Sequence, residues 1–397
     1  MSARDFDLPA PFDSDFFADP YSTYADLREA APVHRVALPD GTPIWLVLRE
    51  ADVRSWLSDP RLTVDKKHSG SGYKGFSLPP ALDANLMNLD GDSHQRLRRL
   101  VSKAFTPRRT GSLRESVVRA AEHLAENVSR AEACDLVNDF AIPLPLIVIG
   151  DMLDVPEKDR RPFADWVSTM LAPEHPAEIA ESISAIHAFL IDLVAARRRS
   201  PGDDLLSALI DARDNEDKLT EDELVSLAFL LLMAGSENVQ HIVSNGIHTL
   251  LQHPDQLDEI RDRTTLIPQA VEELLRLVHP NQMAIRRFPT VAIQIAGTEV
   301  PAGDTVMLCL ASANRDPARY PEPDRFDLHR VDKTHLALGH GFHFCLGASL
   351  ARMEAEVAIN TLLSRFPKMR HAVPVSQLDW RASFRSHALK ALPVELS

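Results

Sequence analysis

The chain has 397 residues, 45% of them hydrophobic, and a formal net charge of -14 at pH 7. The acidic balance argues against nucleic acid as the main partner. No Gly/Ser-rich linker, long charge run or internal repeat divides the sequence. We therefore predict a single domain over residues 1–397, although the length alone would suggest two or three.

Signals for secretion or for a membrane are missing from the sequence. Residues 1–6 have no basic start followed by an apolar stretch. The most apolar run, residues 224–235, is about 12 residues long, whereas a membrane span needs roughly 20. The three cysteines are far apart, which argues against a disulfide framework. We expect a cytoplasmic, soluble protein that does not bind a membrane.

Helix signals dominate the chain. Residues 94–109 carry six Lys/Arg and no carboxylate, which indicates either a solvated basic helix or a docking site for an acidic partner. Thr220 followed by Glu223 is a capping box, and His253-Pro254 ends the pattern, so one helix is predicted from about 220 to 252. Further helices are predicted from about 268 to 278 and from just after Cys345 to about 366.

Strand signals are few. Residues 43–48 and 306–310 are typical of strands, and residues 291–300 alternate around Ala296-Gly297 as a hairpin does. Residues 312–330 carry no regular pattern. The fold class is therefore mainly α with a small β portion.

One cysteine has an unusual setting. Gly339, Gly341 and Gly347 surround Cys345, and glycine permits positive φ and close approach of a flat body to the backbone. The predicted helix begins just after Cys345, and a helix N-terminus favours the thiolate. This setting suits an iron ligand. A structural cysteine remains an alternative, and so does a zinc site with the nearby histidines, although the second ligand pair typical of zinc is missing.

A polar island interrupts the apolar face of the long predicted helix. It reads Ala234-Gly235-Ser236-Glu237-Asn238. A glycine inside a helix costs about 1 kcal/mol relative to alanine. We expect a benefit that offsets this cost.

These motifs together resemble the cytochrome P-450 family. Gly341, His343, Cys345 and Gly347 match its haem-binding loop, with Leu338 where the family has Phe. The sequence Glu273-Leu-Leu-Arg276 resembles the Glu-x-x-Arg motif, 72 residues before Cys345. The resemblance implies a single-domain P-450 fold that holds haem b between the long helix and the Cys345 loop, with Cys345 on the iron.

The resemblance also assigns roles to individual residues. A buried structural network would comprise Glu273, Arg276 and Arg325. The haem propionates and the ring would contact His94, Arg98, Arg287, His343, Gly235, Phe344 and Gly347. Oxygen activation would involve Ser236, Glu237 and Asn238, the last standing where the family has Thr. The substrate pocket would include Leu89, Ala234, Met283, Ile285 and His387.

The function implied is a monooxygenase that inserts one atom of dioxygen into a C-H or C=C bond of a small organic substrate. Electrons would come from a ferredoxin and an NAD(P)H-dependent ferredoxin reductase, because the chain shows no flavin or iron-sulfur motif. Natural-product tailoring is a common role of soluble bacterial members. Two alternatives remain open: oxidative coupling or desaturation at the same haem, and a non-catalytic haem sensor. The sequence identifies neither the substrate nor the position that is oxidised.

Overall fold

The structure is a computed structural model that describes residues 8–70, 72–73, 78–173, 175–214 and 218–396. Contacts between Cα atoms divide the chain into two compact units. Unit 1 comprises Met1–Phe76, Glu272–Leu346 and Asp379–Ala388, and unit 2 comprises Ser77–Val271, Gly347–Leu378 and Leu389–Ser397. The prediction of a single domain over residues 1–397 stays a prediction.

Unit 1 contains most of the β structure. Its strands are β1 (Val33–Ala37), β2 (Pro43–Val47), β3 (Leu62–Thr63), β5 (Phe288–Pro289), β6 (Ile293–Ile295), β7 (Thr298–Val300) and β8 (Val306–Leu308). Its helices are α1 (Ser14–Ala18), α2 (Pro20–Ala30), α3 (Glu50–Leu57) and α15 (Leu310–Ala313). The largest sheet has the order β1-β2-β8, in which β2 pairs antiparallel with β1 and parallel with β8. The strands predicted at 43–48, 291–300 and 306–310 are confirmed to within a few residues.

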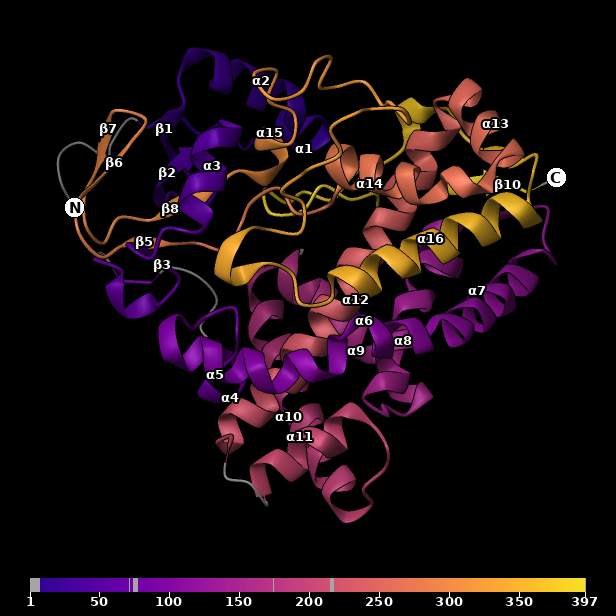
Figure 1. The fold of residues 1–397 in the computed structure, drawn as a ribbon, viewed down its shortest axis with the longest axis horizontal. Coiled ribbons are helices and arrows are strands. Elements are labelled where there is room, and N and C mark those ends of the chain that lie inside the picture. The colour runs from indigo at the N-terminus through magenta and orange to yellow at the C-terminus, as the bar shows by residue number, and fades with distance from the viewer. Residues whose placement is uncertain (1–7, 71, 74–77, 174, 215–217, 397) are drawn as a thin grey trace. The chain divides into compact units, whose positions relative to one another are not determined.

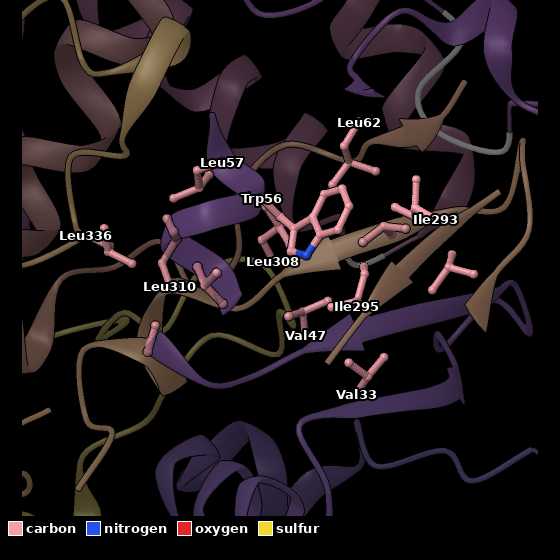
Figure 2. Close-up of a cluster of buried hydrophobic side chains, with 14 residues drawn as sticks. Val33, Val47, Trp56, Leu57, Leu62, Ile293, Ile295, Leu308, Leu310 and Leu336 are labelled. Atoms are coloured by element: carbon pink, nitrogen blue, oxygen red, sulfur yellow. The ribbon is translucent and has the colours of Figure 1, made fainter. Parts of the chain in front are cut away.

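A hydrophobic cluster joins α3 to these sheets. Trp56 lies at its centre in Figure 2, with Leu62, Val47 and Leu308 around the indole ring. The β6–β7 hairpin adds Ile295, which is fully buried. Burying such side chains contributes about 1.5–3 kcal/mol each, so this cluster fixes the sheets that carry the neighbouring loops.

Unit 2 is mainly helical. Its helices are α4 (Pro80–Asp83), α5 (Gly91–Ser102), α6 (Pro107–Ser112), α7 (Arg114–Val128), α8 (Pro143–Met152), α9 (Glu157–Leu171), α10 (Pro176–Arg199), α11 (Leu205–Asp214), α12 (Glu221–Leu251), α13 (Pro254–Asp262) and α16 (Ala348–Arg365). Its strands are β4 (Ala133–Asp135), β9 (Arg370–His371) and β10 (Pro393–Glu395), in the order β4-β10-β9. Helix α14 (Ile267–Val278) passes from unit 2 into unit 1.

Helix α12 is the central element of unit 2. Thr220 caps it, and the side chains of Thr220 and Glu223 each accept a hydrogen bond from the other residue's backbone N–H. The helix ends at Leu251, so the predicted bounds of 220 and 252 are confirmed. It packs against α4, α8, α10 and α16, and α16 is also in contact with α7 (Figure 1). Most of its side chains are buried, and apart from the two ends of the helix the exceptions lie in its middle.

Helix α10 is the one described helix that is long and apolar enough to cross a membrane, over Ala177–Arg199. The sequence prediction did not single it out. A lone helix of this kind is weak evidence, because core helices of soluble proteins meet the same criteria. Here α10 packs against α9, α11 and α12.

Candidate functional site

The loop that carries Cys345 lies in unit 1 and is tightly turned. Gly339 and Gly341 have φ of +76° and +71°, a region that side chains with a Cβ rarely adopt. A Cβ at Gly341 would also lie 2.8 Å from the Cβ of Ser58 on the segment that follows α3. The Cys345 amide donates to the Leu338 carbonyl at 2.8 Å and closes the loop. The glycines therefore serve the turn that presents the thiol.

Two aromatic side chains next to the cysteine are exposed. Phe342 is 53% exposed and Phe344 is 40% exposed. Exposed apolar groups around one thiol are typical of a surface that an apolar ligand covers. Along the chain, Cys345 precedes Gly347, the N-cap of α16, by two residues. The thiol thus lies close in sequence to a helix N-terminus, as predicted.

The Glu-x-x-Arg pair on α14 is fully buried. Arg276 donates from Nε and Nη2 to the two carboxylate oxygens of Glu273 at 2.9 and 2.8 Å. Both side chains have no exposed surface. Two parallel bonds to one carboxylate are among the strongest ionic contacts. The sequence prediction that these residues form a buried network is supported by this geometry.

The third side chain of the network is Arg330, which corrects the prediction of Arg325. Arg330 donates from Nε to both carboxylate oxygens of Glu273 at 2.9 and 3.2 Å. The Arg325 side chain instead pairs with Glu322 and is 58% exposed. Arg325 contributes its carbonyl, which accepts from Arg276 and Arg330. The chain turns between 325 and 330, so position in the motif did not reveal which guanidinium points inward.

The network also holds the irregular segment before Cys345. Arg276 Nη1 donates to the carbonyls of Asn314 and Pro323 at 2.8 and 2.7 Å. The Asn314 side-chain oxygen accepts from the Leu336 amide at 2.7 Å. Leu336 lies two residues before Leu338, where the cysteine loop closes. The sequence analysis did not identify Asn314. No motif at this position or in the neighbouring Arg315-Asp316-Pro317 indicates a structural role.

Basic side chains that are buried or half-buried lie in both units. In unit 1, Arg287 is 4% exposed and donates to the Leu62 carbonyl at 3.3 Å, while His343 is half-buried. In unit 2, His94 is 3% exposed on α5, and Arg98 follows one turn later on the same helix. Burial of guanidinium and imidazole groups is expected where carboxylates bind. The predicted contacts of these four residues with the haem propionates stay predictions.

In the middle of α12, several side chains are exposed or half-buried. Ala234 is exposed, although it lies in the centre of the buried helix, and Asn238 is half-buried one turn later on the same face. No residue that the structure describes forms a hydrogen bond with the buried Asn238 Oδ1. Gly235 has a packing role that the sequence did not reveal, because a Cβ there would lie 2.8 Å from Ile149 of α8.

Two polar residues next to Asn238 on α12, Ser236 and Glu237, differ in their burial and contacts. Ser236 is 2% exposed, and its hydroxyl donates to the Leu232 carbonyl at 2.8 Å. Glu237 is half-buried, and its Oε1 lies 3.7 Å from His241 Nε2. A carboxylate beside an imidazole is a suitable pair for holding and moving a proton. The Ser236 hydroxyl is thus already engaged by the helix backbone, and the catalytic roles of Ser236, Glu237 and Asn238 stay predictions.

The predicted pocket residues have mixed surroundings. Leu89 and Ile285 are half-buried, and Ala234 is exposed. Met283 is 8% exposed and packs in a core cluster. The His387 ring stacks on Trp380 with a centroid distance of 3.9 Å and an interplanar angle of 11°. These five roles in substrate binding stay predictions.

The residues present fit a cysteine-ligated haem. Unit 1 by itself holds a turned loop that presents one thiol, exposed aromatics beside it, and the buried guanidinium of Arg287, which suits a carboxylate. The unsatisfied Asn238 Oδ1 and the exposed Ala234 supply a polar atom and open space on one helix face.

Comparison with known proteins decides the family. The cytochrome P450 family model matches residues 148–371. The chain is 41% identical to cytochrome P450 monooxygenase PikC of Streptomyces venezuelae over 383 residues, which cover 96% of this chain and 92% of PikC. The chain belongs to the cytochrome P450 family. It is also 39% identical to 6-deoxyerythronolide B hydroxylase of Saccharopolyspora erythraea, with 96% and 97% of the two chains covered.

Solved structures agree with this assignment. The tirandamycin C-bound P450 monooxygenase TamI superposes with a TM-score of 0.93 at 40% identity, covering 98% of this chain and 100% of that one. The predicted mainly helical P450 fold is confirmed. This cytochrome P450 is a monooxygenase that uses a cysteine-ligated haem, as its relatives do.

Proposed function

We propose that this P450 inserts one oxygen atom into a C-H or C=C bond of a natural product, with Cys345 as the iron ligand. The similarity to enzymes named for natural products carries the proposal: 6-deoxyerythronolide B hydroxylase and, at 38% identity, mycinamicin IV hydroxylase/epoxidase of Micromonospora griseorubida. The test is oxygen-18 incorporation. Incubation of the holoenzyme with candidate polyketides under labelled dioxygen should give a product that gains one labelled oxygen atom.

The haem supplies dioxygen activation when it is bound. The chain's own contribution on α12 is to orient polar groups and move protons. Asn238 can donate and accept hydrogen bonds through its amide. It cannot readily pass a proton on, because that would leave a high-energy tautomer. Asn238 therefore positions a water or a polar group of the substrate, and Glu237 with His241 holds and delivers the proton.

Replacement of Glu237 by glutamine is expected to slow turnover roughly a hundredfold or more, because a positioned acid or base contributes about 10²–10⁴-fold. Asn238→Ala is expected to lose only part of the coupling of NAD(P)H consumption to product. Asn238→Thr should improve coupling with substrates that lack a well-placed hydroxyl. The measurement is product formed per NAD(P)H consumed, with peroxide release recorded. A neutral Glu237→Gln together with nearly complete peroxide release by Asn238→Ala would contradict this division of roles.

Electrons are proposed to come from an acidic ferredoxin and its NAD(P)H-dependent reductase, in the cytoplasm. The basic face of α5 is the proposed docking surface. Arg96 is engaged within the chain, since it pairs with Glu223 and donates to the Lys218 carbonyl at 2.6 Å. Arg99 and Lys103 are exposed, and no ion pair with another described residue involves either of them. They border a cavity of about 650 Å³.

Charge reversal at Arg99 and Lys103 is expected to lower ferredoxin-supported turnover several-fold at low salt, because opposite charges speed the encounter of the two proteins. The effect should shrink as salt screens the charges. Turnover driven by peroxide should be unchanged and serves as the control. Equal losses in both assays would show that Arg99 and Lys103 support folding and not docking.

Oxidative coupling is a second candidate that one structural neighbour favours. The P450 enzyme CxnD, described for C-S bond formation in chuangxinmycin biosynthesis, superposes with a TM-score of 0.89 at 34% identity. Asn238 in place of the family's Thr is the feature of this chain that fits such a departure. Product mass distinguishes the two, since coupling removes two hydrogens and adds no oxygen.

A further inference from the structure

Helix α12 carries a buried polar stripe that runs from its middle toward its C-terminal end. The stripe consists of Glu237, His241, Ser244 and His248. Residues three or four apart lie on one face of a helix, with about 5–6 Å between their Cβ atoms. His241 is 3% exposed, Ser244 is fully buried, and His248 is 6% exposed. Most buried side chains are apolar, so a row of polar groups along one face indicates a role beyond packing.

The first two members of the stripe form the pair that is proposed to hold and deliver protons. Glu237 Oε1 lies 3.7 Å from His241 Nε2. Further along the helix, the Ser244 hydroxyl donates to the His241 carbonyl at 3.3 Å. A hydrogen bond of that length is weak. Rotation about the Cα–Cβ bond brings the hydroxyl within reach of the histidine rings one turn before and one turn after it.

The last member of the stripe is linked to the protein surface. His248 Nδ1 lies 3.0 Å from Nε2 of His371 on β9, and the two ring centroids are 5.1 Å apart. Burial lowers the pKa of His248 to about 4, and the charge of His371 lowers it as well, while burial lowers the pKa of His371. Both rings are therefore neutral near neutral pH, and one donates to the other. His371 is half-buried, so solvent reaches this end of the stripe.

Each group in this row can accept a proton and give one up. A neutral imidazole accepts at one ring nitrogen and releases a proton from the other, and a hydroxyl does both at its oxygen. A carboxylate accepts a proton and then serves as the acid. Each transfer needs only a neighbour within hydrogen-bond reach, so such a row passes a proton from end to end. The Asn238 amide does not pass a proton on, so protons must arrive from another direction.

We infer that the polar stripe and His371 form a route that carries protons from solvent to Glu237. The inference rests on the proposed role of Glu237 and His241, and it names the source of their protons. Insertion of one oxygen atom into a C-H bond consumes dioxygen, two electrons and two protons, and it yields the hydroxylated product and one water. For each proton delivered, His371 takes one up from solvent and the groups between pass it on in turn. They then return to their starting tautomers and orientations.

The first test interrupts the route at its middle and at its solvent end. Ser244→Ala should slow turnover supported by NAD(P)H about a hundredfold, the low end of what a positioned acid or base contributes. His371→Gln should do the same, because an amide keeps a hydrogen bond to His248 but does not relay a proton. The assay uses the holoenzyme, excess ferredoxin and reductase, and the polyketide that the wild type oxidises fastest. Turnover driven by hydrogen peroxide should be unchanged, since peroxide brings its own protons.

Thr249→Val is the matched control. Thr249 is 5% exposed on the same helix, and its hydroxyl also donates to a backbone carbonyl one turn earlier, that of Asn245, at 2.8 Å. Its position lies about 100° from that of His248 around the helix, so it is outside the stripe. Valine removes the hydroxyl at nearly equal size. This variant should match the wild type in both assays, which separates loss of a relay from loss of any buried hydroxyl.

A second readout does not depend on turnover. Nitrogen-15 NMR of the histidine-labelled ferrous carbon monoxide form distinguishes protonated from unprotonated ring nitrogens and responds to their hydrogen bonds. Ser244→Ala should shift the ring nitrogens of His241 and His248. His371→Gln should shift those of His248 and not those of His241. Thr249→Val should leave all of these signals in place.

Wild-type turnover by either Ser244→Ala or His371→Gln would overturn the inference. Equal losses in the NAD(P)H and peroxide assays would also overturn it, because they would show a structural role. Ring-nitrogen signals that Ser244→Ala leaves unshifted would do the same. Failure of the role proposed for Glu237 is separate, because it would appear as unchanged turnover of Glu237→Gln. Failure of this inference alone leaves Glu237→Gln slow.

Discussion

Replacement of Cys345 by histidine is expected to abolish the far-red-shifted Soret band of the reduced carbon monoxide complex. That band would report a thiolate ligand on the haem iron, because a thiolate pushes electron density toward the iron. A neutral imidazole in its place gives the ordinary spectrum of histidine-ligated haem. Oxygen-dependent turnover should fall to background at the same time, whereas residual haem binding through the basic side chains is expected to persist.

The other two cysteines supply the controls. Cys309 is fully buried, and burial raises the pKa of its thiol to about 12. Cys134 lies on β4, and burial with its acidic neighbours also raises its pKa to about 12. Neither thiol forms a thiolate near neutral pH, so Cys309→Ala and Cys134→Ala should keep the band. Retention of the band by Cys345→His would refute the ligand assignment.

Local signals explain which parts of the fold the sequence predicted well. The ends of α12 follow from the Thr220 and Glu223 capping box and from Pro254, all within one turn of the boundary. The turned loop at Cys345 follows from Gly339 and Gly341, whose positive φ is a property of glycine itself. Such features depend on neighbours in the chain, and a sequence displays those neighbours directly.

Contacts between segments that are distant in the chain could not be predicted from the sequence. Gly235 was interpreted as space for a ring, whereas its missing Cβ also makes room for Ile149 on α8. The offset pairing of Met283 with Cys309 and of Arg287 with Val306 leaves one extra residue between 283 and 287. A sequence shows neither the register of two irregular segments nor which side chains they bring together.

Arg330 and Arg325 are expected to differ strongly in how much they stabilise the protein. Arg330→Ala is expected to destabilise the protein by about 3–5 kcal/mol, the cost of breaking a buried ion pair. Glu273 would lose one of its two guanidinium partners, and the carbonyls of Pro321 and Glu322 would lose their donor. Arg325→Ala removes an exposed pair with Glu322, which contributes about 0–1 kcal/mol.

Thermal unfolding of the two holoenzymes and the rate at which each loses haem measure the difference. Because the network holds the segment leading to Leu336, Arg330→Ala should also release haem faster, while Arg325→Ala should match the wild type. If Arg330→Ala fails to fold, Arg330→Lys provides the comparison, since it keeps the charge but loses most of the carbonyl bonds and should be intermediate. Equal effects of the two alanine variants, or a larger effect at Arg325, would mean that the exposed pair and not the buried guanidinium supports the cysteine loop.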